Sequence, residues 1–286
     1  MLKLSFAGHE VKTKAMKKIL LLFRCTPVVV FLLSHPLQAF ITDFGTEADF
    51  TNNFNSYGST DGLSWNSGGF IRQSDGTTSN SASVLVPGGH QEVFALDNLK
   101  LSMDFRFNGL SSPSVGFYFG VQGEATPNNG LFALFTGTTN SVRYRFFEAG
   151  DPSTSSAGTT RSDTIVSTGG TGQPANFVAG TWYNLQLATS IMNDNQISAT
   201  LSWYGYDSSS LVLLHELSYT YTVTQSAAYL DGGQVGLRMI RPQSNTTDVG
   251  SFAAIPEVRH AGVIVGLIVV GLAIGLRRAR RAVIAQ

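Results

Sequence analysis

Two carboxylates about 5 Å apart form the core machinery of a retaining glycosidase. Alternate residues of a β-strand face the same side, so such a pair can be separated by one residue. Glu47 and Asp49 come closest to this spacing, but they stand alone near the start of the central region. Asp104, Glu148 and Glu216 are each isolated from other acidic residues. The sequence therefore predicts that the protein is not an enzyme.

Histidine and cysteine chemistry also lacks the residues that it needs. The histidines between residues 40 and 254 are His90 and His215, and neither lies near a Gly-x-Ser-x-Gly nucleophile motif. Two scattered histidines do not make a zinc ligand set. Cys25, the only cysteine, falls in a predicted leader, so the central region has no thiol nucleophile and no disulfide.

Calcium is the metal that the composition best accommodates. Asp194, Asp231 and Asp248 supply the oxygen ligands that Ca²⁺ prefers in proteins. No spacing ties these residues together, and aspartate is also a common turn residue. We predict no cofactor, with a structural calcium ion as the alternative.

A sugar-binding site needs an exposed aromatic side chain beside amides and carboxylates. Trp65 precedes the loop-like stretch Asn-Ser-Gly-Gly, and Tyr206 lies near the end of a predicted strand. Trp182 and Tyr204 are further aromatic candidates, whereas Trp203 alternates with apolar residues and is assigned to the core. Trp65 and Tyr206 are therefore candidate glycan contacts, with packing in the core as the competing interpretation.

The charge of the chain is unevenly distributed. The whole chain is neutral, but residues 40–254 contain 17 acidic and eight basic residues, a net charge of −9. Lys100 is the only lysine in this region. An acidic surface of this kind argues against nucleic acid as a partner.

The elements that must position these residues are predicted to be strands. Residues 99–107 alternate apolar and polar side chains without a break, which indicates a half-buried antiparallel strand. Similar patterns cover 115–121, 131–135, 142–147, 182–188, 197–204, 211–223 and 235–240, with weaker candidates at 83–86 and 92–96. The Ser/Thr/Gly-rich stretches 67–83 and 151–173 are predicted to be loops, and no helical periodicity precedes residue 255. We predict an all-β, antiparallel jelly-roll sandwich over residues 40–254.

Several sequence motifs in the predicted strands resemble those of the concanavalin A-like lectin/glucanase superfamily, including its laminin-G-like modules. They are the strand 99–107, the run Gly180-Thr181-Trp182-Tyr183-Asn184-Leu185, and Val235-Gly236-Leu237-Arg238. The resemblance covers about residues 80–252 and implies the sandwich fold. Glucanases of the superfamily carry a Glu-x-Asp-x-x-Glu run on one strand, and this sequence lacks it.

The N-terminal 39 residues have the features of a secretory leader. Met16-Lys17-Lys18 begins a basic stretch, an apolar stretch follows over 19–33, and Leu37-Gln38-Ala39 ends in a small residue. We predict that translation starts at Met16 and that a signal peptidase cuts between Ala39 and Phe40.

The C-terminal segment 255–286 combines three features. Pro256-Glu257 is followed by an uncharged apolar run over 261–276 and then by Arg277, Arg278, Arg280 and Arg281. Sixteen helical residues span roughly 24 Å, and flanking arginines can extend that reach. Basic residues after the helix predict that this end lies in the cytoplasm and that the preceding domain lies outside.

This segment resembles the PEP-CTERM sorting signal of Gram-negative bacteria that make exopolysaccharide. In that family a Pro-Glu-Pro motif precedes a membrane helix and an arginine-rich tail, and an exosortase processes it. Pro256 and Glu257 match the first two positions, whereas Val258 replaces the second proline. The resemblance implies an exosortase-type enzyme and the inner membrane as partners.

Three functions remain open. The first is a non-catalytic protein of the cell surface or the exopolysaccharide matrix. The second is a lectin-like carbohydrate-binding module, with extracellular polysaccharide as its partner. The third is a polysaccharide hydrolase with a site that the sequence motifs do not reveal.

Overall fold

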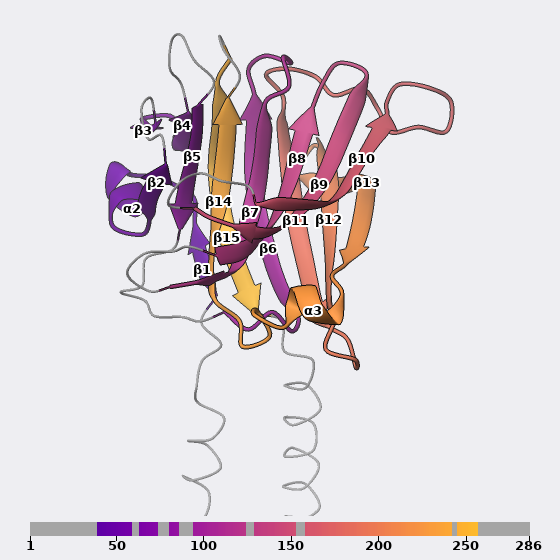
Figure 1. Ribbon diagram of the computed structural model, residues 1–286. Helices are drawn as coiled ribbons and strands as arrows, with labels where there is room; N and C mark the ends of the chain where they lie inside the picture. Colours follow the sequence, from indigo (N-terminus) through magenta and orange to yellow (C-terminus); the bar gives the residue numbers. More distant parts are fainter. Residues whose placement is uncertain are drawn as a thin grey trace, which may run out of the picture. The chain divides into compact units, whose positions relative to one another are not determined.

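A computed structural model describes residues 39–58, 63–73, 80–85, 94–123, 129–152, 158–241 and 245–256. Its strands form two antiparallel sheets, with α3 at one end of the strands and α2 beside β2 (Figure 1). The predictions for the leader up to Gln38, for His90, for Glu257, for the run 261–276 and for the terminal arginines fall outside the described residues. In the part of the chain that is described, no helix has the length and apolar character needed to span a membrane.

The first sheet has eight strands within the described residues. Its order is β13-β12-β11-β6-β15-β4-β3, and β1 pairs with β15. The strands are β1 (Phe40–Thr42), β3 (Leu63–Asn66), β4 (Phe70–Gln73), β6 (Leu99–Phe107), β11 (Trp182–Ile191), β12 (Ile197–Asp207), β13 (Ser210–Thr220) and β15 (Thr247–Pro256).

The second sheet has seven strands in the order β10-β9-β8-β7-β14-β5-β2. They are β2 (Asn55–Gly58), β5 (Asn80–Leu85), β7 (Ser114–Gln122), β8 (Asn129–Gly137), β9 (Ser141–Gly150), β10 (Thr159–Ser167) and β14 (Gln234–Arg241). The predicted all-β antiparallel fold is confirmed.

The core lies between the sheets and is rich in aromatic side chains. Along β6 every second residue, from Leu99 to Phe107, is buried, as the alternation predicted. Trp203 is fully buried and lies 5.6 Å from Phe135 of the opposite sheet, measured between ring centroids. Residues between the buried positions of β6 therefore point to the outer face of the eight-stranded sheet.

Two segments that were predicted to be loops contain strands. β10 lies within 151–173, and β4 and most of β5 lie within 67–83. β10 is an edge strand whose side chains are mostly exposed, so its Ser/Thr-rich sequence lacks an apolar stripe. β10 is a strand because it pairs with β9, and the local sequence pattern does not contain that pairing.

Two short helices also went unpredicted, α2 (Glu47–Thr51) and α3 (Val223–Ser226). Each begins with a capping box, Thr46 with Asp49 and Thr222 with Gln225. In a helix of four or five residues such caps matter more than periodicity, because the helix is too short to show a stripe.

The last strand extends beyond the predicted domain end at residue 254. β15 continues through Ile255, which pairs with Lys100, to Pro256, which pairs with Leu99. The first residue of the predicted sorting motif thus belongs to the sheet. At the other end β1 begins at Phe40, the first residue after the predicted cleavage site, and Phe40 pairs with Ala254.

Candidate functional site

The outer face of the eight-stranded sheet carries polar and aromatic side chains at the positions that alternate with the core. On β6 these positions include Ser102, Asp104 and Arg106, and the register places Asn184 of β11 beside Asp104. We call this surface the outer polar face.

Asp104 is the centre of a hydrogen-bond network on the outer polar face. Its Oδ1 accepts hydrogen bonds from Asn184 Nδ2, at 2.8 Å, and from the hydroxyl of Tyr206. Its Oδ2 accepts one from Ser251 Oγ at 2.8 Å. Four strands, β6, β11, β12 and β15, therefore meet at one carboxylate. The sequence predicted an isolated, solvated Asp104, and no local signal could have shown these partners because they lie 80 to 147 residues away.

Tyr206 is 43% exposed although its hydroxyl is hydrogen-bonded to Asp104. Burial and the neighbouring Asp104 carboxylate raise the pKa of Tyr206. The phenol therefore stays protonated and acts as a donor, while its ring presents an apolar surface to solvent. This placement supports Tyr206 as a candidate ligand contact.

A second carboxylate, Asp248, anchors the neighbouring part of the face. Arg72 Nε lies 2.7 Å from Oδ1, and Arg106 Nη2 lies 2.6 Å from Oδ2. Asn108 Nδ2 donates to Oδ2 at 2.9 Å. Burial alone would raise the pKa of Asp248, but hydrogen bonds from Arg72, Asn108 and Arg106 hold it below its usual value.

This arrangement removes Asp248 from the candidate calcium ligands, because both of its oxygens are occupied by arginines. Asp194 and Asp231 are exposed turn residues. Within the described part of the chain, no group of three His, Cys, Asp or Glu side chains is arranged to hold a metal ion.

The guanidinium of Arg106 contacts two aromatic rings that also contact each other. Its Cζ is 4.6 Å from the ring centroid of Trp182 and 5.4 Å from that of Phe70. Gly250 makes room for the indole, since a Cβ at that position would lie 3.2 Å from two ring carbons of Trp182. Trp182 is therefore a partly exposed aromatic surface in a fixed position beside the Asp104 network.

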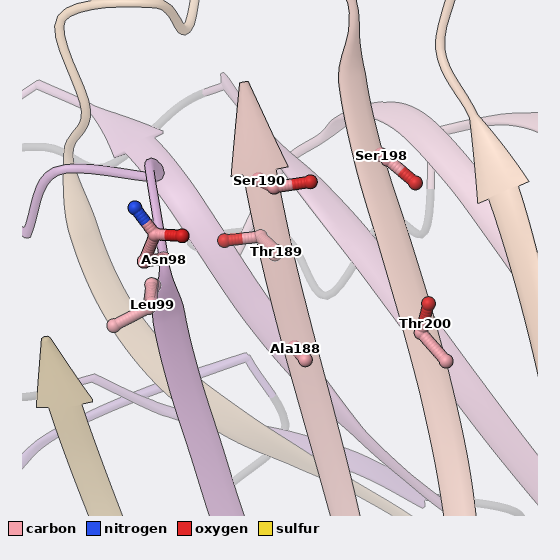
Figure 2. Close-up of a pocket in the computed structure, with 7 residues that line it drawn as sticks. All are labelled: Asn98, Leu99, Ala188, Thr189, Ser190, Ser198 and Thr200. Atoms are coloured by element: carbon pink, nitrogen blue, oxygen red, sulfur yellow. The ribbon is translucent and has the colours of Figure 1, made fainter. Parts of the chain in front are cut away.

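A small pocket lies further along the same face, where β11 ends and β12 begins. Its volume is about 210 Å³, and Figure 2 shows its lining residues. They are Asn98, Leu99, Ala188, Thr189, Ser190, Ser198 and Thr200. Ser190, Ser198, Thr200 and Asn98 supply the polar side chains of this set, whereas the Thr189 hydroxyl is buried and donates to the backbone oxygen of Leu96 at 2.6 Å. Ala188 and Asn184 are four residues apart on β11, about 13 Å at the usual strand rise. Gln186 lies between them and donates to Asn184 Oδ1 at 2.8 Å, so a polar band runs along β11 from the network towards the pocket.

Trp65, the other predicted glycan contact, does not join this band. It lies in β3 rather than in a loop, and β4, β15, β6 and β11 separate β3 from the strand of Tyr206. Trp65 Nε1 donates a hydrogen bond to the backbone oxygen of Phe44 at 2.7 Å, and the ring packs against the core. These contacts support a structural role. Trp182, a further aromatic candidate in the sequence, lies partly exposed beside polar side chains, which is the environment predicted for Trp65.

The residues considered for catalysis make separate structural contacts. Asp49 accepts hydrogen bonds from Thr46 in the cap of α2. His215 Nδ1 lies 3.3 Å from the Tyr144 hydroxyl, and burial lowers the pKa of His215. Within the described residues, neither side chain has a hydrogen bond to the Asp104 network.

No protein-family model matches the sequence, and no curated protein sequence does so. Among solved structures, lectin I from Ulex europaeus is 10% identical, with a TM-score of 0.44 over 76% of this chain and 96% of the lectin. An alginate lyase from Aplysia kurodai is 11% identical, with a TM-score of 0.49 over 77% of this chain and 99% of the lyase. The β-glucanase of Bacillus licheniformis is 10% identical, with a TM-score of 0.45 over 77% and 98%.

The lectin and the β-glucanase are concanavalin A-like lectin/glucanase sandwiches. The likeness concerns the fold alone. The three similar structures are a lectin, a lyase and a hydrolase, so the similarity does not distinguish binding from catalysis.

Proposed function

We propose that this chain is an exported, non-catalytic protein that binds extracellular polysaccharide on the outer polar face. The observation that carries the proposal is the placement of Trp182 and Tyr206 beside the Asp104 network. Sugars present apolar CH faces and hydroxyl groups together, so they bind where aromatic rings adjoin fixed donors and acceptors. The nearby pocket, whose lining includes Asn98, Ser190 and Ser198, offers further hydrogen-bonding groups to a sugar chain.

Binding is favoured over hydrolysis because Asp104 and Asp248, the carboxylates nearest to Trp182 and Tyr206, are already engaged. Asp104 accepts from Asn184, Tyr206 and Ser251, and Asp248 accepts from two arginines and Asn108. A general acid must carry a proton at working pH, which requires a raised pKa, and that of Asp248 is lowered. Asp248 is therefore suited to positioning donors on this face.

The proposed location follows from the two terminal segments. A leader cut after Ala39 would release the domain across the inner membrane, and an exosortase-type enzyme would act on the segment that begins at Pro256. Because β15 ends at Pro256, four residues connect the sheet to the predicted membrane helix. A short link of this kind would hold the polysaccharide-binding domain at the outer side of the inner membrane until the tail is removed.

Retardation of the protein in gels that contain extracellular polysaccharides tests this function. The Trp182→Ala variant should bind about tenfold more weakly, because an aromatic contact at the centre of a site is worth more than about 1 kcal/mol. Ile165→Ala is the control, since Ile165 is exposed on β10 of the other sheet. Equal retardation of all three proteins would refute the site, and turnover of a polysaccharide would favour the hydrolase alternative.

A further inference from the structure

The outer face of the seven-stranded sheet concentrates positive charge within an otherwise acidic domain. Its arginines on β9, β10 and β14 are Arg143, Arg145, Arg161 and Arg238. Two of them are neutralised by neighbouring carboxylates. Arg143 donates through Nε to Asp163 Oδ1 at 2.6 Å and also contacts Oδ2, and Arg161 Nη2 lies 2.8 Å from Glu148 Oε2.

Arg145 differs from these two arginines. The strand register places Asp163 opposite Arg145, but both oxygens of Asp163 are engaged by Arg143. Arg145 Nη2 donates to Thr136 Oγ1 at 3.2 Å, whereas its Nε is buried and has no hydrogen-bond partner. Within the described residues no carboxylate lies in ion-pair contact with Arg145. A buried cationic donor without an acceptor costs several times more than an ordinary hydrogen bond contributes.

A second guanidinium lies nearby on the same face. Arg238 is 6% exposed and lies 5.3 Å from the ring centroid of Phe132, and Arg145 lies 5.8 Å from that of Phe147. The two rings stack on one another at 5.5 Å. Burial lowers the pKa of Arg145, and the charges of Arg143 and Arg238 lower it further against the opposing charge of Asp163, so cationic neighbours outnumber anionic ones at Arg145.

We propose that Arg145 is the centre of an oxyanion-binding site on the outer face of the seven-stranded sheet, and that its ligand is a carboxylate or sulfate group. A planar guanidinium forms two parallel hydrogen bonds with such a group. Arg145 is partly exposed, so an oxyanion can approach its guanidinium and supply the counter-charge that no ion pair of the described residues provides. The partly exposed Arg143 beside Arg145 gives an approach from solvent. An acidic polysaccharide supplies such groups as uronate or sulfate ester, and free sulfate has the same chemistry. The site is separate from the outer polar face.

The thermal midpoint of the full chain tests this proposal. Trigalacturonate should raise the midpoint, and its fully methyl-esterified form, which has no charge, should not. A parallel arm with inorganic sulfate at equal ionic strength distinguishes a free oxyanion from a uronate that needs its sugar. The stabilisation should vanish in Arg145→Met and persist in Arg161→Gln, where the lost charge was already paired.

The Arg145→Met variant should fold, because an apolar side chain of similar length removes an uncompensated buried charge. Its midpoint without ligand should equal or exceed that of the natural protein. Arg145→Lys provides a second variant, which retains the charge but loses the bidentate geometry and should bind about tenfold more weakly. Equal anion effects in the natural protein and in Arg145→Met, or none in either, would overturn the site. Trp182→Ala should leave the anion effect intact, so the two sites can fail independently.

Discussion

Asp248 shows how one residue can fix a binding surface without contacting a ligand. Two arginines from β4 and β6 converge on its carboxylate, and the rings of Phe70 and Trp182, which meet edge to face, both contact the guanidinium of Arg106. The position of Trp182 therefore depends on a buried ion pair. Removing the Asp248 charge is costly, because two arginines that are only partly exposed then lose their shared counter-charge.

We expect Asp248→Asn to lower the free energy of unfolding by about 3–5 kcal/mol, the usual cost of breaking a buried ion pair. The matched substitution Asp163→Asn should cost about 1 kcal/mol or less, because that pair is largely exposed to solvent. Urea denaturation at neutral pH measures both values. Equal losses in the two variants would show that the Asp248 cluster has no special role.

The same residue predicts a pH dependence. The pKa of Asp248 is lowered in the folded protein, whereas an unfolded aspartate titrates near about 3.9. Its contribution to stability is thus complete above that value and is lost as pH falls through the lower folded pKa. The natural protein should lose stability steeply below about pH 4, and Asp248→Asn should lose less over the same interval. Parallel curves for the two proteins would contradict this assignment.

At the scale of elements, β15 links the core, the outer polar face and the end of the domain. It pairs with β6, β4 and β1, and a register shift between Val249 and Ser251 places Gly250 under Trp182. A side chain at Gly250 should lift the indole from the sheet. We expect Gly250→Ala to weaken polysaccharide binding slightly and Gly250→Val to weaken it about tenfold, as loss of a central contact does. Unfolding measured on the same samples separates displacement of Trp182 from loss of the fold.

The sequence predicted the central strands because their alternation reports a face buried against the core. This signal was strong for β6 and for β12, where Trp203 lies in the core as expected. It was absent for β10, which is an exposed edge, and for β3 and β4, which are four residues long. For these strands the partner strand, and not the local pattern, decides the structure.

The candidate site was harder to predict than the fold. Tyr206 was chosen because it lies near a strand end, but Trp65 was preferred to Trp182 on local composition alone. Glycine and serine beside Trp65 indicated exposure, whereas the ring packs against the core from β3. The Asp104 network depends on register between strands distant in sequence, which no local pattern contains.

At the scale of the whole molecule, the two ends of the domain are paired strands. Phe40 lies beside Ala254, and β15 ends two residues later. Intact-mass analysis of the protein from cells and medium should find a chain that begins at Phe40. A C-terminus near Glu257 would show processing by an exosortase-type enzyme, and a mass that includes Arg277 to Arg281 would show a retained membrane tail. Recovery of the uncut chain from the cytosol would refute the proposed export.

The three tryptophans provide the most direct test of polysaccharide binding on the outer polar face. Trp65 Nε1 is bonded to Phe44, Trp203 Nε1 is buried without a partner, and Trp182 lies on the outer polar face, so each indole N–H should give a distinct NMR signal. Titration with a polysaccharide fragment that the protein retains should shift the Trp182 signal and leave the other two in place. A shift at Trp65 with Trp182 unchanged, or no shift at saturating ligand, would contradict the account.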